Sequence, residues 1–224
     1  MKFGVVVFPG SNCDKDIVDA LQNEMHQEVT ELWHKDKDLS GFNKTDCIIL
    51  PGGFSYGDYL RCGAIARFSP MMQSVIEFAN KGGKVLGVCN GFQILCESGL
   101  LPGVLLKNAN MQFVCKNVFI TGGNKTEKIH VLKIPVAHGD GRYYAKEEIL
   151  NEIQHKDQVL FRYCNEEGLV HADYSPNGSV NNIAGICNGE RNVFGLMPHP
   201  ERACSTLLGN TDGKKIFSQL FSIN

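Results

Sequence analysis

The sequence has no strong charge imbalance and no long block of like charge. Its 224 residues include 22 basic and 24 acidic side chains, which give a formal net charge of −2 with neutral histidines. A broad basic surface for nucleic acid or for an anionic membrane is therefore not expected. The expected partner is a small molecule or another protein.

Long apolar runs, repeats and paired cysteines are also missing. The apolar start, Met1–Gly10, is too short for a signal peptide or a membrane span and is expected to form a first strand. No repeat, low-complexity tract or Gly/Ser-rich linker interrupts the chain, which predicts one domain over residues 1–224. The nine cysteines contain no CxxC pair, and their odd number favours reduced thiols in the cytoplasm over a disulfide framework.

A Walker-type phosphate loop is absent as well. Gly209–Lys215 has the wrong spacing and no Ser or Thr after its lysine, and Gly122–Thr126 lacks the glycine before its lysine. We therefore expect no ATP chemistry in this chain.

The first half of the sequence alternates between apolar, β-branched runs and helical segments. The expected strands are Phe3–Phe8, Val29–Trp33, Cys47–Leu50 and Lys84–Val88, and the expected helices lie near Asp14–Glu24, Pro70–Asn80 and Asn90–Ser98. This alternation predicts an α/β fold, in which crossover helices flank a central parallel sheet.

After about Leu101 the pattern changes to short strands. They are expected at Phe113–Phe119, His130–Pro135, Val159–Tyr163, Asn182–Cys187 and Val193–Met197, followed by a helix near Lys214–Phe221. We expect these strands to add to the sheet in antiparallel orientation. The complete prediction is a single-domain sandwich with a central, mostly parallel sheet, flanking helices and antiparallel strands in the C-terminal half.

Cys89 lies between two glycines, at the point where the apolar run Val85–Val88 stops. A sharp turn from a strand to a helix at this position is the nucleophile-elbow layout, here with a thiol instead of a hydroxyl. It places the sulfur at the carboxyl edge of the sheet, at the positive end of a helix and near a backbone N–H. Cys89 is the candidate nucleophile, although an inert buried cysteine remains the alternative. Inert thiols are expected at Cys47, Cys115, Cys164 and Cys187.

His199 is the candidate base, in the segment Met197–Glu201. Two prolines fix the backbone around it, and residues i and i+2 of an extended segment point the same way, so that Glu201 can hold the imidazole. The other ring nitrogen is then able to accept the cysteine proton. A His/Glu metal site is the rival interpretation, but the spacing shows no third ligand. We therefore expect no metal.

The remaining histidines divide into two groups. Polar or charged neighbours predict surface positions for His26, His34, His130, His155 and His171. His138 instead begins the glycine-rich stretch His138–Arg142, which is expected to form a loop that touches a ligand or a partner.

Pro51-Gly52-Gly53 follows the strand expected at Cys47–Leu50, at the same edge as Cys89. Glycines allow a backbone N–H to approach a ligand closely, so that Gly53 and Asn90 are candidate donors of an oxyanion hole. The alternative for this segment alone is a simple turn.

Together these motifs resemble the triad-type glutamine amidotransferase family, which has a flavodoxin-like fold. Five longer stretches narrow the resemblance to glutaminase subunits of phosphoribosylformylglycinamidine synthase, the PurQ type. They are "FPGSNCD" at Phe8–Asp14, "PGGFSYGDYLRCGAIAR" at Pro51–Arg67, "GVCNGFQIL" at Gly87–Leu95, "HGDGR" at His138–Arg142 and "MPHPERA" at Met197–Ala203.

The resemblance implies that Cys89 attacks the carboxamide of L-glutamine and that Gln93 helps to hold this substrate. It also implies that ammonia passes to a separate, PurL-type synthetase subunit. That subunit would use ATP and Mg²⁺ to convert formylglycinamide ribonucleotide to formylglycinamidine ribonucleotide in purine synthesis, and no cofactor would be bound by this chain. The need for an additional small PurS-type subunit stays open.

Three alternatives follow from the same residues. A stand-alone cysteine hydrolase, of the γ-glutamyl hydrolase or peptidase type, would use the same triad without a partner. A non-catalytic scaffold is disfavoured because all three triad positions hold competent residues, and a redox-sensing Cys89 would leave His199 and Glu201 unexplained.

The sequence departs from the family pattern at one position, because the family usually has glutamate where this sequence has Asp140. A gating or docking loop is predicted around Tyr56, Asp58 and Arg61, without individual roles.

Overall fold

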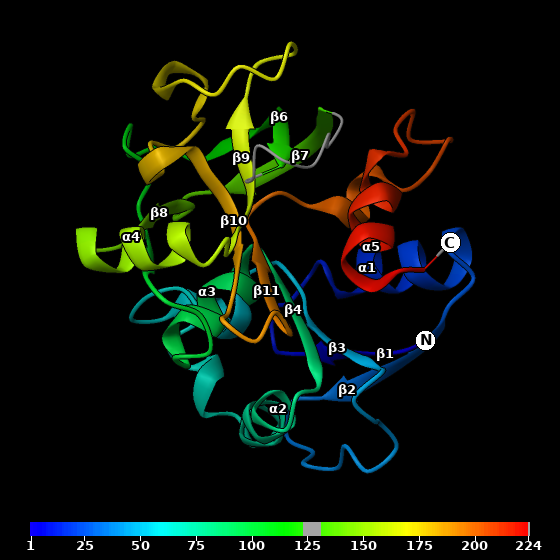
Figure 1. Cartoon of the computed structure of the whole chain (residues 1–224). Coiled ribbons are helices and arrows are strands. Elements are labelled where there is room, and N and C mark those ends of the chain that lie inside the picture. The colour runs from blue at the N-terminus through cyan, green and yellow to red at the C-terminus, as the bar shows by residue number, and fades with distance from the viewer. Residues whose placement is uncertain (123–130, 224) are drawn as a thin grey trace.

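The computed structural model describes residues 1–122 and 131–223 (Figure 1). Within these residues, nine strands form one mixed sheet in the order β2-β1-β3-β4-β11-β10-β9-β6-β7. A separate pair of short strands, β5 (Val104–Leu106) and β8 (Arg142–Tyr144), was not anticipated from the sequence. The α/β prediction is confirmed.

The first half of the chain forms the parallel part of the sheet, as predicted. Its strands are β1 (Lys2–Val7), β2 (Glu28–Trp33), β3 (Cys47–Leu50) and β4 (Lys84–Val88). Its helices are α1 (Asp14–Asp19), continued by a π turn at Ala20–Glu24, α2 (Pro70–Asn80) and α3 (Asn90–Glu97). Helix α2 begins where it does because Pro70 fits the first helical position and the Ser69 hydroxyl accepts from the N–H of Met72.

The antiparallel part of the sheet comes from the second half of the chain. Its strands are β6 (Val114–Gly122), β7 (Leu132–His138), β9 (Val159–Cys164) and β10 (Ile183–Cys187). The strand expected at His130–Pro135 is shifted toward the C-terminus, and His130 itself lies outside the described residues. The helix α4 (Glu147–His155) was missed, whereas α5 (Asp212–Phe221) was expected.

The antiparallel orientation expected for the strand at Val193–Met197 was wrong, and the difference matters for the site. This segment forms β11 (Val193–Leu196), which lies beside β4 and runs parallel to it, with Leu196 opposite Val88. All four of its residues are buried, which suits the centre of the sheet better than an edge. The carboxyl ends of β4 and β11 therefore meet at the same edge, just before Cys89 and His199.

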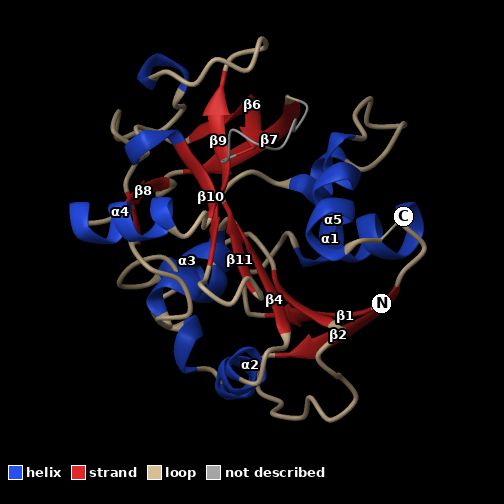
Figure 2. Ribbon diagram, in the orientation of Figure 1, coloured by secondary structure: helices blue, strands red, loops and turns tan. Residues whose placement is uncertain are grey.

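Helices cover both faces of the sheet. On one face lie α1 and α5, and on the other lie α2 and α3 (Figure 2). The ring of Phe221 in α5 packs edge-on against Phe3, with 5.5 Å between centroids, and against Phe194 at 6.0 Å. Gly195, the neighbour of Phe194, leaves room for the Phe92 ring of α3 on the opposite face. Among the described residues no helix is both long and apolar enough to span a membrane.

Candidate active site

Cys89 occupies the strained turn between β4 and α3 that the sequence predicts. Its φ of 51° and ψ of −104° are rare for a residue with a side chain, and such strain costs about 1–3 kcal/mol. The N–H of Cys89 donates to the Leu196 carbonyl of β11 at 2.6 Å. A Cβ on Gly91 would overlap the Leu50 carbonyl, and one on Gly87 would lie 2.5 Å from the Gly91 backbone. Both glycines are therefore required for close packing of the turn.

His199 and Glu201 follow β11 and are almost completely buried. Nδ1 of His199 lies 2.6 Å from Oε1 of Glu201, which fixes the orientation of the ring, as predicted. The extended backbone behind that prediction is not found, because Pro200–Ala203 forms a 3-10 helix that begins directly after His199. Burial, the largest single effect, lowers the pKa of His199, but the Glu201 carboxylate and the Cys89 thiol outweigh it and raise the pKa above its ordinary value. The electrostatics of the site favour an imidazolium held between the carboxylate and the cysteine sulfur.

The candidate oxyanion donors lie in the expected places. Gly53 has a φ of 118°, and a Cβ there would come within 2.6 Å of the Asn12 nitrogen, so that only glycine fits. Within the described residues, the N–H groups of Gly53 and Asn90 donate to no other atom. Both remain available to an incoming ligand, and their role as a pair stays a prediction.

The side chain of Asn90 connects three parts of the site. Its Oδ1 accepts from the N–H of Ser55 at 3.1 Å and from the Ser55 hydroxyl, and its Nδ2 donates to Asp58 at 3.1 Å and to Gln93 Oε1 at 2.8 Å. Gln93 Nε2 in turn donates to the carbonyl of Asp140 at 2.7 Å. Burial raises the pKa of Asp58. The loop after β3, helix α3 and the loop after β7 are thereby held in one arrangement.

Sequence reasoning missed Cys13 and Arg202. The Cys13 thiol lies beside the triad, and its Sγ accepts from Arg202 Nη2 at 3.2 Å, while Arg202 Nε donates to Asp16 at 3.0 Å. Burial raises the pKa of Cys13 to about 12, against the opposing effect of Arg202. Ligand atoms of Cys13, His199 and Glu201 all lie within 4.8 Å of one another. The third metal donor that the spacing did not show is therefore present in three dimensions.

A cavity of about 150 Å³ reaches the base from the molecular surface. Its wall includes Cys13, Gly53, Phe54, His199 and Arg202. Its size suits a small substrate better than the larger ligands that fill pockets of about 300 Å³ or more.

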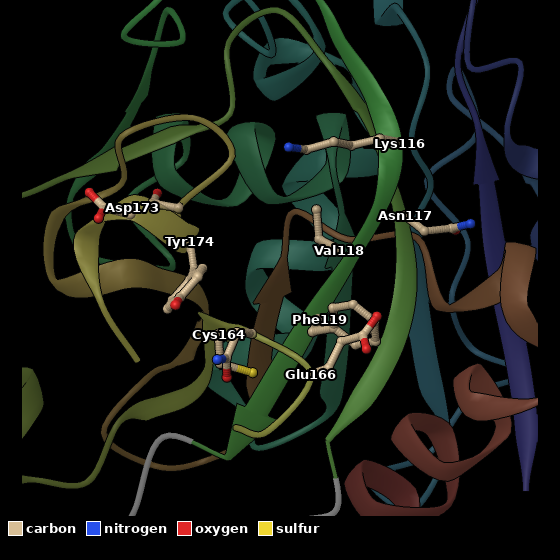
Figure 3. Close-up of a pocket in the computed structure, with 10 residues that line it drawn as sticks. Lys116, Asn117, Val118, Phe119, Cys164, Glu166, Asp173 and Tyr174 are labelled. Atoms are coloured by element: carbon tan, nitrogen blue, oxygen red, sulfur yellow. The ribbon is translucent and has the colours of Figure 1, made fainter. Parts of the chain in front are cut away.

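Another hollow, of about 290 Å³, lies over β6 and β9, and its wall contains none of the triad residues (Figure 3). The polar ends of Lys116, Glu166 and Asp173 lie on different sides of it and do not converge (Figure 3). It therefore offers no arrangement for catalysis.

One expectation about histidines needs correction. His34 is buried, not exposed, and its Nδ1 lies 2.5 Å from the Tyr56 hydroxyl, because β2 ends beneath the loop after β3. His138 is buried at the end of β7, where Nδ1 lies 3.1 Å from Asn108 Oδ1, and contact of its loop with a ligand or a partner stays a prediction. Only the Asp140 carbonyl of that loop reaches Gln93. The surface positions of His26, His155 and His171 are confirmed.

The other expectations have mixed outcomes. Cys47, Cys164 and Cys187 are buried as expected, whereas Cys115 is exposed because it lies on the outer face of β6. Arg61 pairs with Glu97 at 2.6 Å, in the loop for which no individual roles were predicted.

Comparison with known proteins gives the family directly. Residues 1–221 match the family described as the CobB/CobQ-like glutamine amidotransferase domain. The chain belongs to this family. It is 52% identical to phosphoribosylformylglycinamidine synthase subunit PurQ of Moorella thermoacetica, over 98% of this chain and 95% of that protein. It is 51% identical to the subunit of the same name from Gloeobacter violaceus, over 98% and 97%.

Solved structures agree with this assignment. A chain of the structure of PurLQS from Thermotoga maritima is 41% identical, with a TM-score of 0.83 over 99% of this chain and 97% of that one. A second glutamine amidotransferase from Thermotoga maritima is 15% identical, with a TM-score of 0.57 over 100% and 86%, and supports the fold alone.

Proposed function

We propose that this chain is the glutaminase subunit of phosphoribosylformylglycinamidine synthase. The observation that carries the proposal is the buried His199–Glu201 pair beside Cys89, in a chain that matches PurQ subunits over nearly its whole length. The reaction is hydrolysis of L-glutamine to glutamate and ammonia, and the ammonia serves the synthetase subunit.

The first half of the reaction forms a thioester. The Cys89 sulfur attacks the side-chain carbonyl of glutamine, and the oxygen that becomes negative is held by the N–H groups of Gly53 and Asn90. His199, kept protonated by Glu201, donates its proton to the departing nitrogen, and ammonia leaves.

The second half regenerates the enzyme. His199 removes a proton from water, the hydroxide attacks the thioester carbonyl, and the carbon–sulfur bond breaks to release glutamate and free the Cys89 sulfur. The proton stays on His199, and the proton of the new carboxyl group passes to solvent. Gln93 positions the substrate glutamine from the first turn of α3, where it is already anchored by Asn90 and Asp140.

Two thiols lie near His199, and we assign the nucleophile to Cys89. Cys89 lies at the start of α3, where its sulfur is next to His199 and the free N–H groups of the first turn can hold the developing oxyanion. Cys13 is deeply buried, accepts from Arg202 and has a pKa raised to about 12, so that it stays a protonated thiol near neutral pH.

The chemistry explains the need for a partner. Ammonia released into water near neutral pH is protonated and loses its nucleophilicity, so the glutaminase works docked on a PurL-type synthetase subunit, with or without a small PurS-type subunit. ATP and Mg²⁺ belong to that partner, and this chain carries no cofactor. We place the protein in the cytoplasm, since all nine cysteines are free thiols.

The proposal is tested by measuring glutamate release with this chain alone and with the synthetase subunit, its ribonucleotide substrate and ATP. We expect weak activity alone and strong activity in the mixture. Full activity without the synthetase would instead identify a stand-alone cysteine hydrolase.

The assignment of the nucleophile is tested with paired variants. Cys89→Ala is expected to lower glutamine-dependent synthesis at least about 1,000-fold while ammonia-dependent synthesis by the complex continues. Cys13→Ala is the matched control, and it should keep most of the glutamine-dependent rate. The opposite ranking of the two variants would make Cys13 the nucleophile.

A further inference from the structure

Cys13, His199 and Glu201 form a buried cluster with three kinds of metal-binding donor. Their ligand atoms, one sulfur, one imidazole nitrogen and one carboxylate oxygen, all lie within 4.8 Å of one another. Glutamine hydrolysis uses His199 and Glu201 but gives Cys13 no role. We propose that the cluster is an inhibitory site for a thiophilic divalent cation, with Zn²⁺ as the preferred ion.

The donor set favours zinc over harder ions. Thiolate, imidazole and carboxylate are the ligands of catalytic-type zinc sites, which use three protein groups and leave one position open. Zinc bond lengths of about 2.0–2.3 Å require donors about 3.3–3.6 Å apart in a tetrahedral site. Donors within 4.8 Å therefore need only small side-chain shifts to reach bonding positions.

Two buried atoms of the cluster are unpaired within the part of the chain that the structure describes. Oε2 of Glu201 and Nε2 of His199 have no hydrogen-bond partner there, although both residues are more than nine-tenths buried. A buried carboxylate oxygen without a partner is costly. A cation bound between Glu201 and Cys13 would satisfy it.

The charges at the site also balance. Zinc with the Cys13 thiolate and the Glu201 carboxylate is neutral, because the neutral imidazole adds no charge. Arg202 lies 3.2 Å from the Cys13 sulfur, and as an N–H donor it supports a metal-bound thiolate from outside the coordination shell. Its own charge is partly offset by Asp16, which accepts from Arg202 Nε at 3.0 Å.

An ion can reach the cluster through the cavity of about 150 Å³, because Cys13 and His199 both lie on its wall. Once bound, the ion takes the place of the Nδ1 proton that His199 shares with Glu201, and the ring stays neutral with its remaining proton on Nε2. The thiol proton of Cys13 is released at the same time. With metal on Nδ1 and a hydrogen on Nε2, the neutral ring is far too weak an acid to protonate the leaving ammonia and has no lone pair left to act as a base. Metal binding and glutamine hydrolysis therefore exclude each other.

Metal binding is tested first, without relying on catalysis. Cys89→Ala protein titrated with Co²⁺ should show a sulfur-to-cobalt absorption band, since Cys13 still supplies a thiolate. Adding Cys13→Ser should remove the band, and Cys13→Ala repeats the test if the serine variant folds poorly. Adding Cys115→Ser, at an exposed thiol of β6, should leave the band unchanged. A missing band, or one that survives loss of Cys13, would overturn the proposal.

Inhibition is tested next, in the assembled synthase, and this arm rests on the proposed function. Zn²⁺ should inhibit glutamine-dependent but not ammonia-dependent synthesis, and a chelator should restore the rate. With each variant normalised to its own metal-free rate, Cys13→Ser should raise the half-inhibitory Zn²⁺ concentration at least about tenfold, since loss of even an outer-shell partner costs about 10- to 100-fold in affinity. An unchanged concentration would overturn the proposal. A metal-free protein without glutaminase activity would contradict the proposed function and leave the Co²⁺ result intact.

Discussion

A methyl group on Gly52 would come within 2.7 Å of Cε1 of His199, so the catalytic ring packs directly on the backbone of the loop after β3. The same methyl group would lie 3.3 Å from the Cys13 sulfur and 3.4 Å from Cβ of Cys89. Gly52 therefore marks the point where the base and both thiols converge. The loop after β3 and the triad therefore pack directly against each other.

Gly52→Ala should inactivate the enzyme without unfolding it. The added methyl displaces the imidazole, and a displacement of about 1 Å costs on the order of 100-fold in rate. Steady-state glutaminase assays and thermal unfolding would measure both effects. Gly189→Ala is the matched control, because a Cβ there meets no atom within 4 Å. A Gly52→Ala enzyme with normal kcat would contradict the packing argument.

Glu201→Gln should reduce kcat by about 1,000-fold or more, since loss of the orienting carboxylate has a comparable effect in serine-protease triads. The pH dependence of the rate distinguishes an electrostatic role of Glu201 from a purely structural one. Glu201 raises the pKa of His199, so its removal should move the alkaline limb of the rate profile to lower pH. If only the rate fell and the limb stayed in place, Glu201 would have a purely structural role.

Gln93→Met should raise KM for glutamine more than it lowers kcat. The substitution removes the bond that Gln93 accepts from Asn90 and the one that it donates to the Asp140 carbonyl, and it leaves the triad in place. In the proposed mechanism these two bonds hold Gln93 toward the substrate. Kinetics with varied glutamine, and ammonia-dependent synthesis as the control, would separate the two parameters. A drop in kcat at constant KM would assign Gln93 to the transition state instead.

His138 should make the protein less stable in mild acid. Burial, aided by the nearby His199, lowers the pKa of His138 to about 4, compared with 6.5 for an ordinary histidine. The unfolded chain therefore binds the extra proton first, and stability is lost as pH falls from about 6.5 toward 4. At pH 5 the loss is about 2 kcal/mol relative to neutral pH.

Urea unfolding of the wild type and of His138→Asn at pH 7 and pH 5 would test this linkage. The variant should lose less stability between the two pH values, whatever its starting stability. Equal losses in both proteins would show that His138 is not the group that titrates.

Local sequence signals were sufficient for several parts of the site. The glycines around Cys89 predict a turn that only small residues allow, and the structure shows that both would otherwise collide with backbone. The i, i+2 spacing of His199 and Glu201 predicts their contact, which is 2.6 Å. His199 and Glu201 are close in sequence and stay in contact although Pro200–Ala203 is a 3-10 helix and not an extended segment. Gly87 is required by the backbone of Gly91 within the turn, whereas Gly91 is required by the Leu50 carbonyl of the neighbouring strand β3.

Tertiary structure decided what neighbours in sequence cannot encode. The parallel pairing of β11 with β4 brings His199 to Cys89 across more than a hundred residues, and it depends on which apolar strand fits the centre of the sheet. The contact of Cys13 with Arg202 joins the two ends of the chain, and the burial of His34 results from the path of a distant loop. The sequence by itself determined the chemical groups and their local turns. Only packing of the complete sheet determined which of those groups share a site, because contacts between distant segments are chosen by the best burial of the whole core.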